Sequence, residues 1–191
     1  MTRIVERPAP GDTATHYINA GIFVFPPELF DLLRQVKLSP RGEYELTDAI
    51  RMLLERGDTV RAYDLAGFWV NVTDPATYLE AQRELLGEAD LAPPAVPSGV
   101  QVRCPVVVGS RCVLEPCELG PNVSMGEGCV VGRGARIRDA VVMSGARVGA
   151  GARVETAVVG VNAQVGEGAT LVGNPQGTAA VARRGEQVSR G

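Results

Sequence analysis

Residues 125–154 read MGEGCVVGRGARIRDAVVMSGARVGAGARV, and apolar residues recur in this stretch at steps of six or five. The same period extends through most of the second half of the chain. Glycine directly follows many of the periodic residues, and a small or β-branched residue stands four places after most of them. The periodic apolar residues are Val108, Leu114, Leu119, Met125, Val131, Ile137, Met143, Val148, Val154, Val159, Val165 and Leu171.

This hexapeptide period is typical of a parallel β-helix. Each hexad predicts one short flat side, and three hexads predict a triangular coil whose apolar side chains point into the prism. Glycine is expected where the backbone turns a corner. The pattern predicts about four coils. The small residues, which keep the stacked interior narrow, are Cys112, Val123, Cys129, Ala135, Val141, Ala152, Ala163 and Ala169.

The same half of the chain argues against two kinds of chemistry. Residues 100–191 contain no histidine, and β-helix acyltransferases use a histidine as general base, so acyl transfer is not expected. The four cysteines form no CxxC pair, so a zinc site is not expected either. Cys112 and Cys129 fall on small interior positions, where a thiol behaves as a compact hydrophobe. We interpret the β-helix as a stacking and oligomerisation module.

Composition sets further limits on partners and location. The formal net charge is −3 and the isoelectric point is about 5.3. Such a chain offers no basic field to a nucleic-acid polymer or to an anionic membrane. The first residues carry no signal-peptide pattern, and no apolar run approaches the roughly 20 residues that span a bilayer. A cytoplasmic protein is therefore expected.

Residues 1–86 have the mixed pattern of an α/β fold. Short apolar runs predict strands at residues 3–6, 20–25 and 59–65. Helices are predicted at residues 27–36 and 47–56, the second capped by Thr47. A third helix is predicted from Asp74 as cap and Pro75 at the first helical position. The single histidine, His16, lies in a polar stretch and is expected at the surface.

Four segments follow from these patterns. Residues 1–86 form a partial α/β domain, and residues 87–99, with three prolines and two glycines, form a linker. Residues 100–175 form the β-helix, and residues 176–191 form a tail.

Four short motifs in the first domain point to a known family. They are VERP at residues 5–8, NAGIFVF at 19–25, RGEYELTD at 41–48 and FWVNVTDP at 68–75. In this order, and followed by a hexapeptide β-helix, they resemble the second half of the nucleotidyltransferase domain of nucleotide-sugar pyrophosphorylases. The resemblance implies the C-terminal half of a Rossmann-like domain followed by a left-handed parallel β-helix. The family includes mannose-1-phosphate guanylyltransferases and glucose-1-phosphate thymidylyl- and adenylyltransferases.

The resemblance also implies an activity and a set of site residues. In the family, a sugar-1-phosphate attacks the α-phosphorus of a nucleoside triphosphate with Mg²⁺, and pyrophosphate leaves. Carried over, Glu6 binds sugar hydroxyls, Arg7 replaces the family's phosphate-binding lysine, and Asn19 contacts the sugar. Asn71 stands where most members have a metal-binding aspartate, and its amide oxygen is a neutral magnesium ligand. No catalytic residue is predicted. The alternatives are solvated strand-end charges for Glu6 and Arg7, and a strand-end residue for Asn71.

The nucleotide half of the family's active site has no match in this sequence. No glycine-rich phosphate-binding loop is present. Two hypotheses follow. Either the sequence is a segment of a full enzyme, or it is a non-catalytic regulatory or scaffold subunit that assembles with a full-length pyrophosphorylase. The chain alone is expected to be inactive under both hypotheses, and the sequence does not identify the sugar or the nucleotide.

Overall fold

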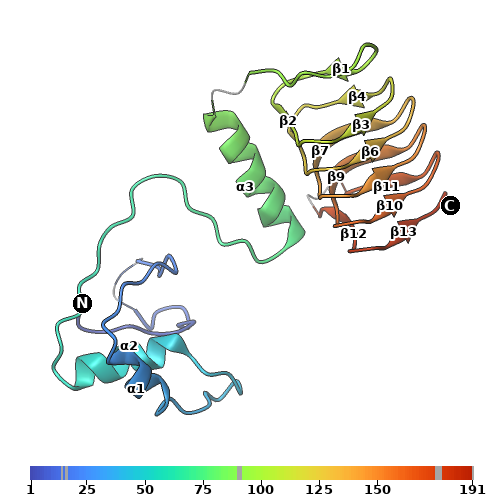
Figure 1. The fold of residues 1–191 in the computed structure, drawn as a ribbon. Coiled ribbons are helices and arrows are strands. Elements are labelled where there is room, and N and C mark those ends of the chain that lie inside the picture. Colours follow the sequence, from blue (N-terminus) through green and yellow to red (C-terminus); the bar gives the residue numbers. More distant parts are fainter. Residues whose placement is uncertain (14, 16, 90–91, 175–177, 191) are drawn as a thin grey trace. The chain divides into compact units, whose positions relative to one another are not determined.

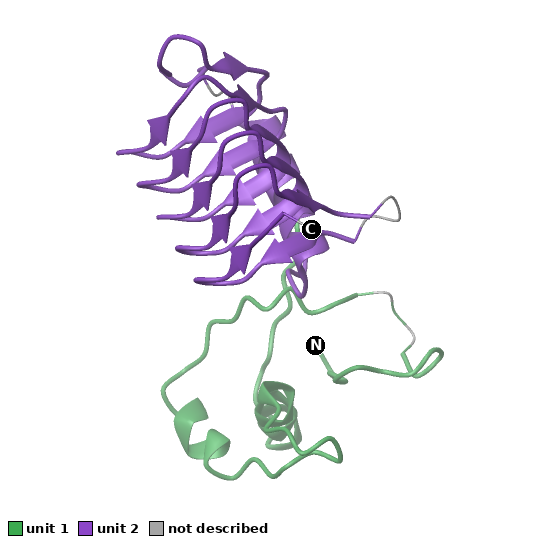
Figure 2. Ribbon diagram, turned by 90° about the vertical axis from the view of Figure 1, so that its right-hand side faces the viewer, with its two compact units in different colours: residues 1–69 green, residues 70–191 purple. Residues whose placement is uncertain are grey.

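The computed structural model describes residues 1–13, 15, 17–89, 92–174 and 178–190, and His16 lies outside them. The chain divides into two compact units, Met1–Trp69 (the first unit) and Val70–Gly191 (the second unit), which are coloured separately in Figure 2.

The second unit is built around a parallel β-helix, whose stacked tiers run from β1 to β13 in Figure 1. Every strand pairing in the described part of this unit is parallel. One side of the β-helix is formed by β1, β4, β7, β9 and β11, a second by β2, β5, β7, β9 and β12, and a third by β3, β6, β8, β10 and β13. The strands are β1 (Gln101–Val102), β2 (Val106–Val108), β3 (Val113–Leu114), β4 (Glu118–Leu119), β5 (Val123–Met125), β6 (Val130–Val131), β7 (Arg136–Val142), β8 (Arg147–Val148), β9 (Arg153–Val159), β10 (Gln164–Val165), β11 (Thr170–Val172), β12 (Ala180–Ala182) and β13 (Gln187–Val188).

Within the described residues the third side contains five strands, so this part of the β-helix has five tiers where the period predicts about four coils. The hexapeptide register predicted the tiers as far as Leu171. It does not extend to β12 and β13, because β11 ends at Val172 and β12 begins only at Ala180. Because the connection between β11 and β12 is longer than one repeat, the spacing of six is interrupted and the sequence pattern does not reveal the last tier.

Most periodic residues point into the prism as predicted, but two assignments were wrong by one position. In the second half of β7, Ala140 and Val142 belong to the core of the prism. Met143 is only half-buried, and Val141 is buried on the outside of the prism, against a helix. The reason is Asp139, whose φ of 48° turns the chain inside β7 and shortens this side by one residue.

The interior is as narrow as the small residues predicted. Cys129, Ala135, Ala152, Ala163 and Ala169 are fully buried. Cys112 is half-buried and packs against the same core, and Cys117 is also buried, although the register had not assigned it. Neighbouring coils approach so closely that a Cβ on Gly132 would lie 2.6 Å from the backbone nitrogen of Ala150.

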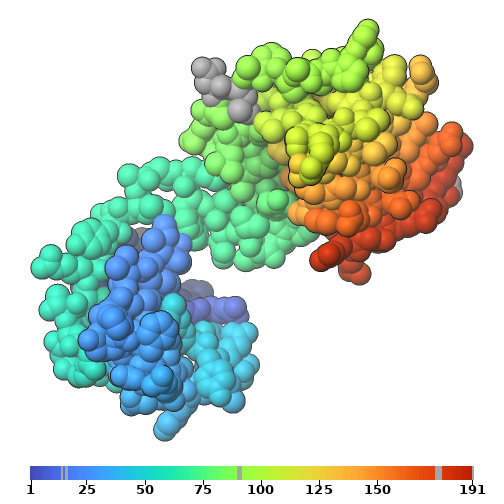
Figure 3. Space-filling model, viewed as in Figure 1, coloured from blue at the N-terminus to red at the C-terminus, as the bar shows by residue number. Residues whose placement is uncertain are grey.

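Helix α3 (Pro75–Glu88) lies alongside the β-helix, as Figures 1 and 3 show, and it belongs to the second unit. It begins as predicted, with Asp74 as N-cap and Pro75 at the first helical position. Sequence patterns placed these residues in the first domain, up to residue 86. In the structure, Leu79 packs on Val141 and Val158 of the β-helix, so the compact first unit already ends at Trp69.

The residues that the structure describes in the first unit form two helices, α1 (Leu29–Leu33) and α2 (Leu46–Glu55), which pack through a small apolar cluster. The strands predicted at residues 3–6, 20–25 and 59–65 are absent; a single bridge between Leu38 and Tyr44 is the only β pairing in the described part of this unit. A strand forms only where another strand accepts its hydrogen bonds, and none lies beside these runs. Phe25 and Val60 pack against the apolar cluster of the helices, but other apolar side chains of these runs stay exposed, with Val24 97% accessible.

Candidate functional site

A cavity of about 520 Å³ lies within the first unit, between the start of the chain, residues 37–41 and α2. Charged side chains of both signs line it, together with a few apolar ones. The charged residues are Arg3, Glu6, Lys37, Arg41, Glu45, Asp48 and Arg51.

Glu6 is held in this cavity by the first turn of α2. The Thr47 hydroxyl donates a 3.1 Å hydrogen bond to Oε2 of Glu6, and Thr47 is only 6% exposed. Thr47 was predicted to cap α2, and that prediction was wrong: the N-cap is Glu45, whose side chain makes no capping bond. The hydroxyl is therefore free to orient the Glu6 carboxylate. Oε1 of Glu6 accepts no hydrogen bond from the part of the chain that the structure describes.

The remaining charges of the cavity fall into two groups. Arg41 donates to Oε1 of Glu45 at 2.5 Å, and Arg51 donates to Asp48 at 2.9 Å. Arg3 and Lys37 form no ion pair with any described residue. A carboxylate that accepts from hydroxyls therefore shares a cavity with two cations that have no anionic partner. This combination suits a ligand that carries both hydroxyls and a phosphate.

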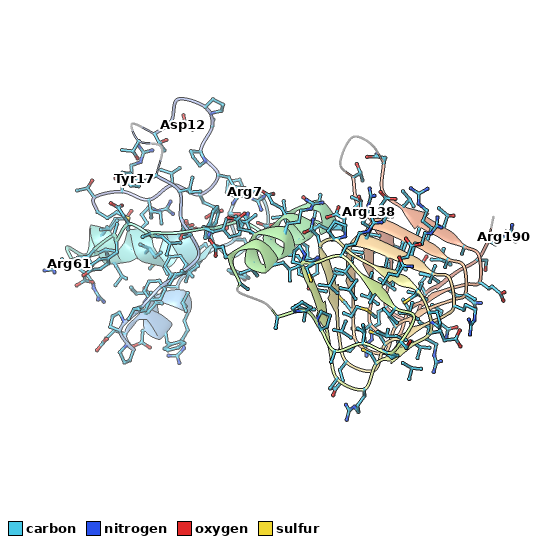
Figure 4. The ribbon with its side chains drawn as sticks, turned by 90° about the horizontal axis from the view of Figure 1, so that it is seen from above. Arg7, Asp12, Tyr17, Arg61, Arg138 and Arg190 are labelled. Carbon is cyan, nitrogen blue, oxygen red and sulfur yellow. The ribbon has the colours of Figure 1, made fainter. Side chains whose placement is uncertain are left out.

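Arg7 and Asn19, the other two residues predicted to bind sugar phosphate, do not line this cavity. Arg7 follows Glu6 directly, with a φ of 43°, and its exposed side chain is labelled in Figure 4. Asn19 is exposed, and its Oδ1 accepts a 2.8 Å hydrogen bond from the amide of Gly21. The structure thus gathers Glu6 with Arg3, Lys37 and Thr47, which the sequence interpretation missed. Arg3 and Thr47 nevertheless lie beside or within the quoted motifs, which was the available signal.

Asn71, the predicted magnesium ligand, lies in the second unit, three residues before the cap of α3, and is exposed. The nearest carboxylate along the chain, Asp74, already accepts from the amides of Ala76 and Thr77 at 2.8 and 2.9 Å. Among the described residues no group of three His, Cys, Asp or Glu side chains is arranged to hold a metal ion. One amide oxygen does not make a magnesium site, so these residues alone do not fit the ion.

Two family models match the chain in tandem. Residues 1–88 match the model described as nucleotidyl transferase, and residues 98–188 match the GMPPB C-terminal domain. The β-helix seen in the structure is the second of these segments. A segment that matches the nucleotidyl transferase model, followed by a hexapeptide-repeat β-helix, therefore defines the class as a nucleotidyltransferase-type chain, and the predicted fold class is confirmed by these matches and by the β-helix.

Curated relatives agree with this class. The protein described as "Probable mannose-1-phosphate guanylyltransferase 1" of Oryza sativa is 33% identical over 149 residues, which are 76% of this chain and 39% of the relative. A glucose-1-phosphate thymidylyltransferase of Streptomyces griseus is 26% identical over 144 residues, 66% of this chain and 40% of the relative. The bifunctional protein GlmU of Levilactobacillus brevis is 32% identical over 138 residues, 66% of this chain and 30% of the relative.

In both halves the chain is therefore similar to sugar-1-phosphate nucleotidyltransferases, a family of transferases. It spans less than half the length of the curated relatives compared with it, from 18% to 40%. No helix in the described part of the chain has the length and apolar character needed to cross a membrane.

Proposed function

We propose that this chain supplies the sugar-phosphate half-site and the β-helix for nucleotidyl transfer from a nucleoside triphosphate to a sugar-1-phosphate. The reaction yields a nucleotide-diphosphate sugar and pyrophosphate. The observation that carries the proposal is the cavity of the first unit, where Thr47 orients the Glu6 carboxylate beside Arg3 and Lys37. The motif that resembles the family's sugar site thus coincides with a cavity whose charged side chains complement a sugar phosphate.

In the proposed site, Glu6 accepts from sugar hydroxyls through the oxygen that Thr47 leaves open. Arg3 and Lys37 neutralise the phosphate. Arg7 and Asn19, which lie outside the cavity lining, keep the sugar-phosphate-binding roles that the family resemblance implies. Charge neutralisation and positioning are the main contributions a protein makes to phosphoryl chemistry. The nucleotide is held by residues outside the matched motifs.

We propose mannose-1-phosphate and GTP as the first substrates to test. The support is the match of residues 98–188 to the GMPPB C-terminal domain and the similarity to the Oryza sativa relative. Glucose-1-phosphate with dTTP or ATP is the competing pair. Magnesium enters this proposal only as the family's cofactor, with Asn71 as one of its ligands.

We also propose oligomerisation through the β-helix and a cytoplasmic location. The coils of a β-helix bury apolar side chains only against their neighbours, so its end tiers favour a covering partner. All four cysteines are unpaired, which is consistent with a reducing compartment.

Calorimetric titration of the 191-residue chain with mannose-1-phosphate tests the half-site directly. We expect binding that is lost with unphosphorylated mannose and weakened about tenfold in Glu6→Gln, because the sugar hydroxyls then donate to a neutral amide oxygen in place of a charged carboxylate. Glu28→Gln, an exposed carboxylate outside the cavity, is the matched control and should bind normally. Equal binding of mannose-1-phosphate by wild type and Glu6→Gln would contradict the proposed site.

A second candidate is a non-catalytic subunit that binds a full-length pyrophosphorylase. The observation that favours it is the exposed apolar surface of the first unit, where Tyr17, Ile22, Val24 and Tyr63 are 70% to 97% accessible. Under both candidates the chain alone should form no nucleotide sugar with GTP, Mg²⁺ and mannose-1-phosphate. Turnover that appears only after a nucleotide-binding segment is added supports the half-site, and a changed activity of an already active pyrophosphorylase supports the subunit.

A further inference from the structure

One corner of the β-helix is built from residues that strain the backbone. Asn122, Asp139 and Thr156 occupy equivalent places in three successive coils, and their φ angles are 57°, 48° and 47°. Glycine adopts this conformation at no steric cost, and a β-branched residue such as Thr156 is rarely found in it. The sequence keeps non-glycine residues in a backbone conformation that favours glycine, which indicates that their side chains make important contacts.

Asp139 is the centre of this corner. Its carboxylate accepts two hydrogen bonds from Arg83 of α3, at 2.6 Å from Nε and 2.7 Å from Nη2. The Thr156 hydroxyl donates a third, at 3.2 Å. The side chain of Asp139 is 19% exposed. The bidentate geometry is the strongest form of an Arg–carboxylate pair.

Other residues of α3 dock on the same corner. Gln82 is 7% exposed, and its Nε2 donates a 2.8 Å hydrogen bond to the backbone oxygen of Asn122. One turn earlier, Leu79 is 1% exposed and packs on Val141 and Val158. The apolar contact has no preferred register, whereas the two polar contacts fix one rotation and one height of the helix.

The segment that leads into α3 is held against the β-helix as well. Val72, Thr73, Asp74 and Tyr78 line a small cavity together with Val158 of β9. The capping box between Asp74 and Thr77 ties this segment to the first turn of α3. Wherever α3 is fixed, the residues just before it are fixed too.

We propose that Arg83 and Asp139 are positioning residues, which lock α3 on the β-helix and thereby hold residues 70–74, including Asn71, in one place. The β-helix then has a role beyond stacking and assembly, because it holds in place residues 70–74, which belong to the motif at residues 68–75. The consequence for the reaction rests on the proposed function, because it takes Asn71 as a site residue. The lock itself does not depend on that assignment.

Hydrogen exchange of the 191-residue chain, followed by NMR, tests the lock without any substrate. In Arg83→Met we expect exchange about fivefold faster at the amides of Thr73, Ala76 and Thr77, the size expected for a half-exposed ion pair. The amides of Gly132 and Gly149, on the third side of the β-helix, should keep their wild-type rates. Arg83→Lys keeps the charge without the fork geometry and should fall between wild type and Arg83→Met.

Glu155→Gln is the matched control. Glu155 is also 19% exposed and pairs with an arginine, Arg138, at 2.7 Å, but that arginine lies on β7 and not on α3. Unchanged exchange at Thr73, Ala76 and Thr77 in Arg83→Met would overturn the proposal. So would equal acceleration in Glu155→Gln, or acceleration that spreads to Gly132 and Gly149, since either would mean general destabilisation. A failed sugar-phosphate titration alongside a positive exchange result would count against the proposed function and not against the lock.

Discussion

Arg83 of α3 and Asp139 of β7 are joined by two hydrogen bonds of 2.6 and 2.7 Å, although they are 56 positions apart in the sequence. The Arg83 guanidinium holds the pKa of the Asp139 carboxyl below its usual value of 3.8. A lowered carboxyl pKa adds stability above the unfolded-state pKa, and this stability is lost as the pH falls through the folded-state pKa. We therefore predict that Arg83→Met lowers the unfolding free energy by about 1 kcal/mol at pH 7.

Urea unfolding of both chains at pH 7 and at about pH 2.5 measures this difference. The difference should decrease at the lower pH, because protonation of the Asp139 carboxyl removes the charge that pairs with Arg83. The expected size is small because the Arg83 side chain is 42% exposed and solvent screens the pair. The same difference at both pH values would show that the aliphatic part of Arg83, and not its charge, stabilises the docked helix.

A second prediction concerns the interior of the β-helix. Ile137 is 1% exposed and lies among the buried residues of the central coils. We predict that Ile137→Ala lowers the unfolding free energy by about 2–5 kcal/mol, because closely stacked coils cannot collapse into the space left behind. Denaturant unfolding measures it, with Val113→Ala as control. Val113 is 59% exposed, and its truncation should change stability by less than about 0.5 kcal/mol.

The interior of the β-helix is the part of the fold that could be predicted best. Its period repeats many times, and each buried residue such as Ile137 or Val154 contacts equivalent residues one coil away. The errors at Met143 and Val141 arose where a side is one residue shorter than the repeat. The period shows that one side of this coil is a residue shorter than six, but it does not show which side. The backbone turn at Asp139 places the shorter side within β7.

The first unit and the docking of α3 could be predicted less well, for a different reason. Strand formation at residues 20–25 depends on a neighbouring strand, which local apolar patterning does not reveal. Likewise the partners of Arg83 and Gln82 lie 56 and 40 positions away. The Glu6 motif was found from the sequence, but its contact with Thr47 spans 41 positions and was missed. Sequence patterns identify residues and faces, whereas long-range polar contacts require the fold.

Thiol reactivity provides a third prediction. Burial raises the pKa of Cys117 and of Cys129 to about 11, whereas Cys104 is exposed. At pH 8 only about one buried thiol in a thousand is the reactive thiolate. A maleimide at pH 8 should therefore label Cys104 and leave Cys117 and Cys129 unmodified, as read by peptide mass spectrometry. The same pKa shifts predict a pH dependence of the free energy of unfolding. The contribution of the two protonated thiols is fully present below about pH 9 and is lost as the pH rises through about 11.

Labelling in denaturant is the control for this prediction, since all four cysteines should then react at similar rates. Rapid labelling of Cys129 in the folded chain would contradict the buried, stacked interior that the structure assigns to it.

The last prediction concerns Thr47, whose hydroxyl donates to Glu6 from a position that is 6% exposed. Thr47→Val keeps the shape of the side chain and removes only the donor. If Glu6 binds the sugar, the freed carboxylate should rotate away from its bound position, and we expect mannose-1-phosphate to bind about five- to tenfold more weakly. Thr47→Ser retains the hydroxyl and should restore most of the affinity, while circular dichroism should show α2 intact in both variants. Weakened binding in Thr47→Ser as well would mean that the methyl group, through packing, sets the site. Full affinity in Thr47→Val would show that Glu6 needs no orientation from α2 to hold its ligand.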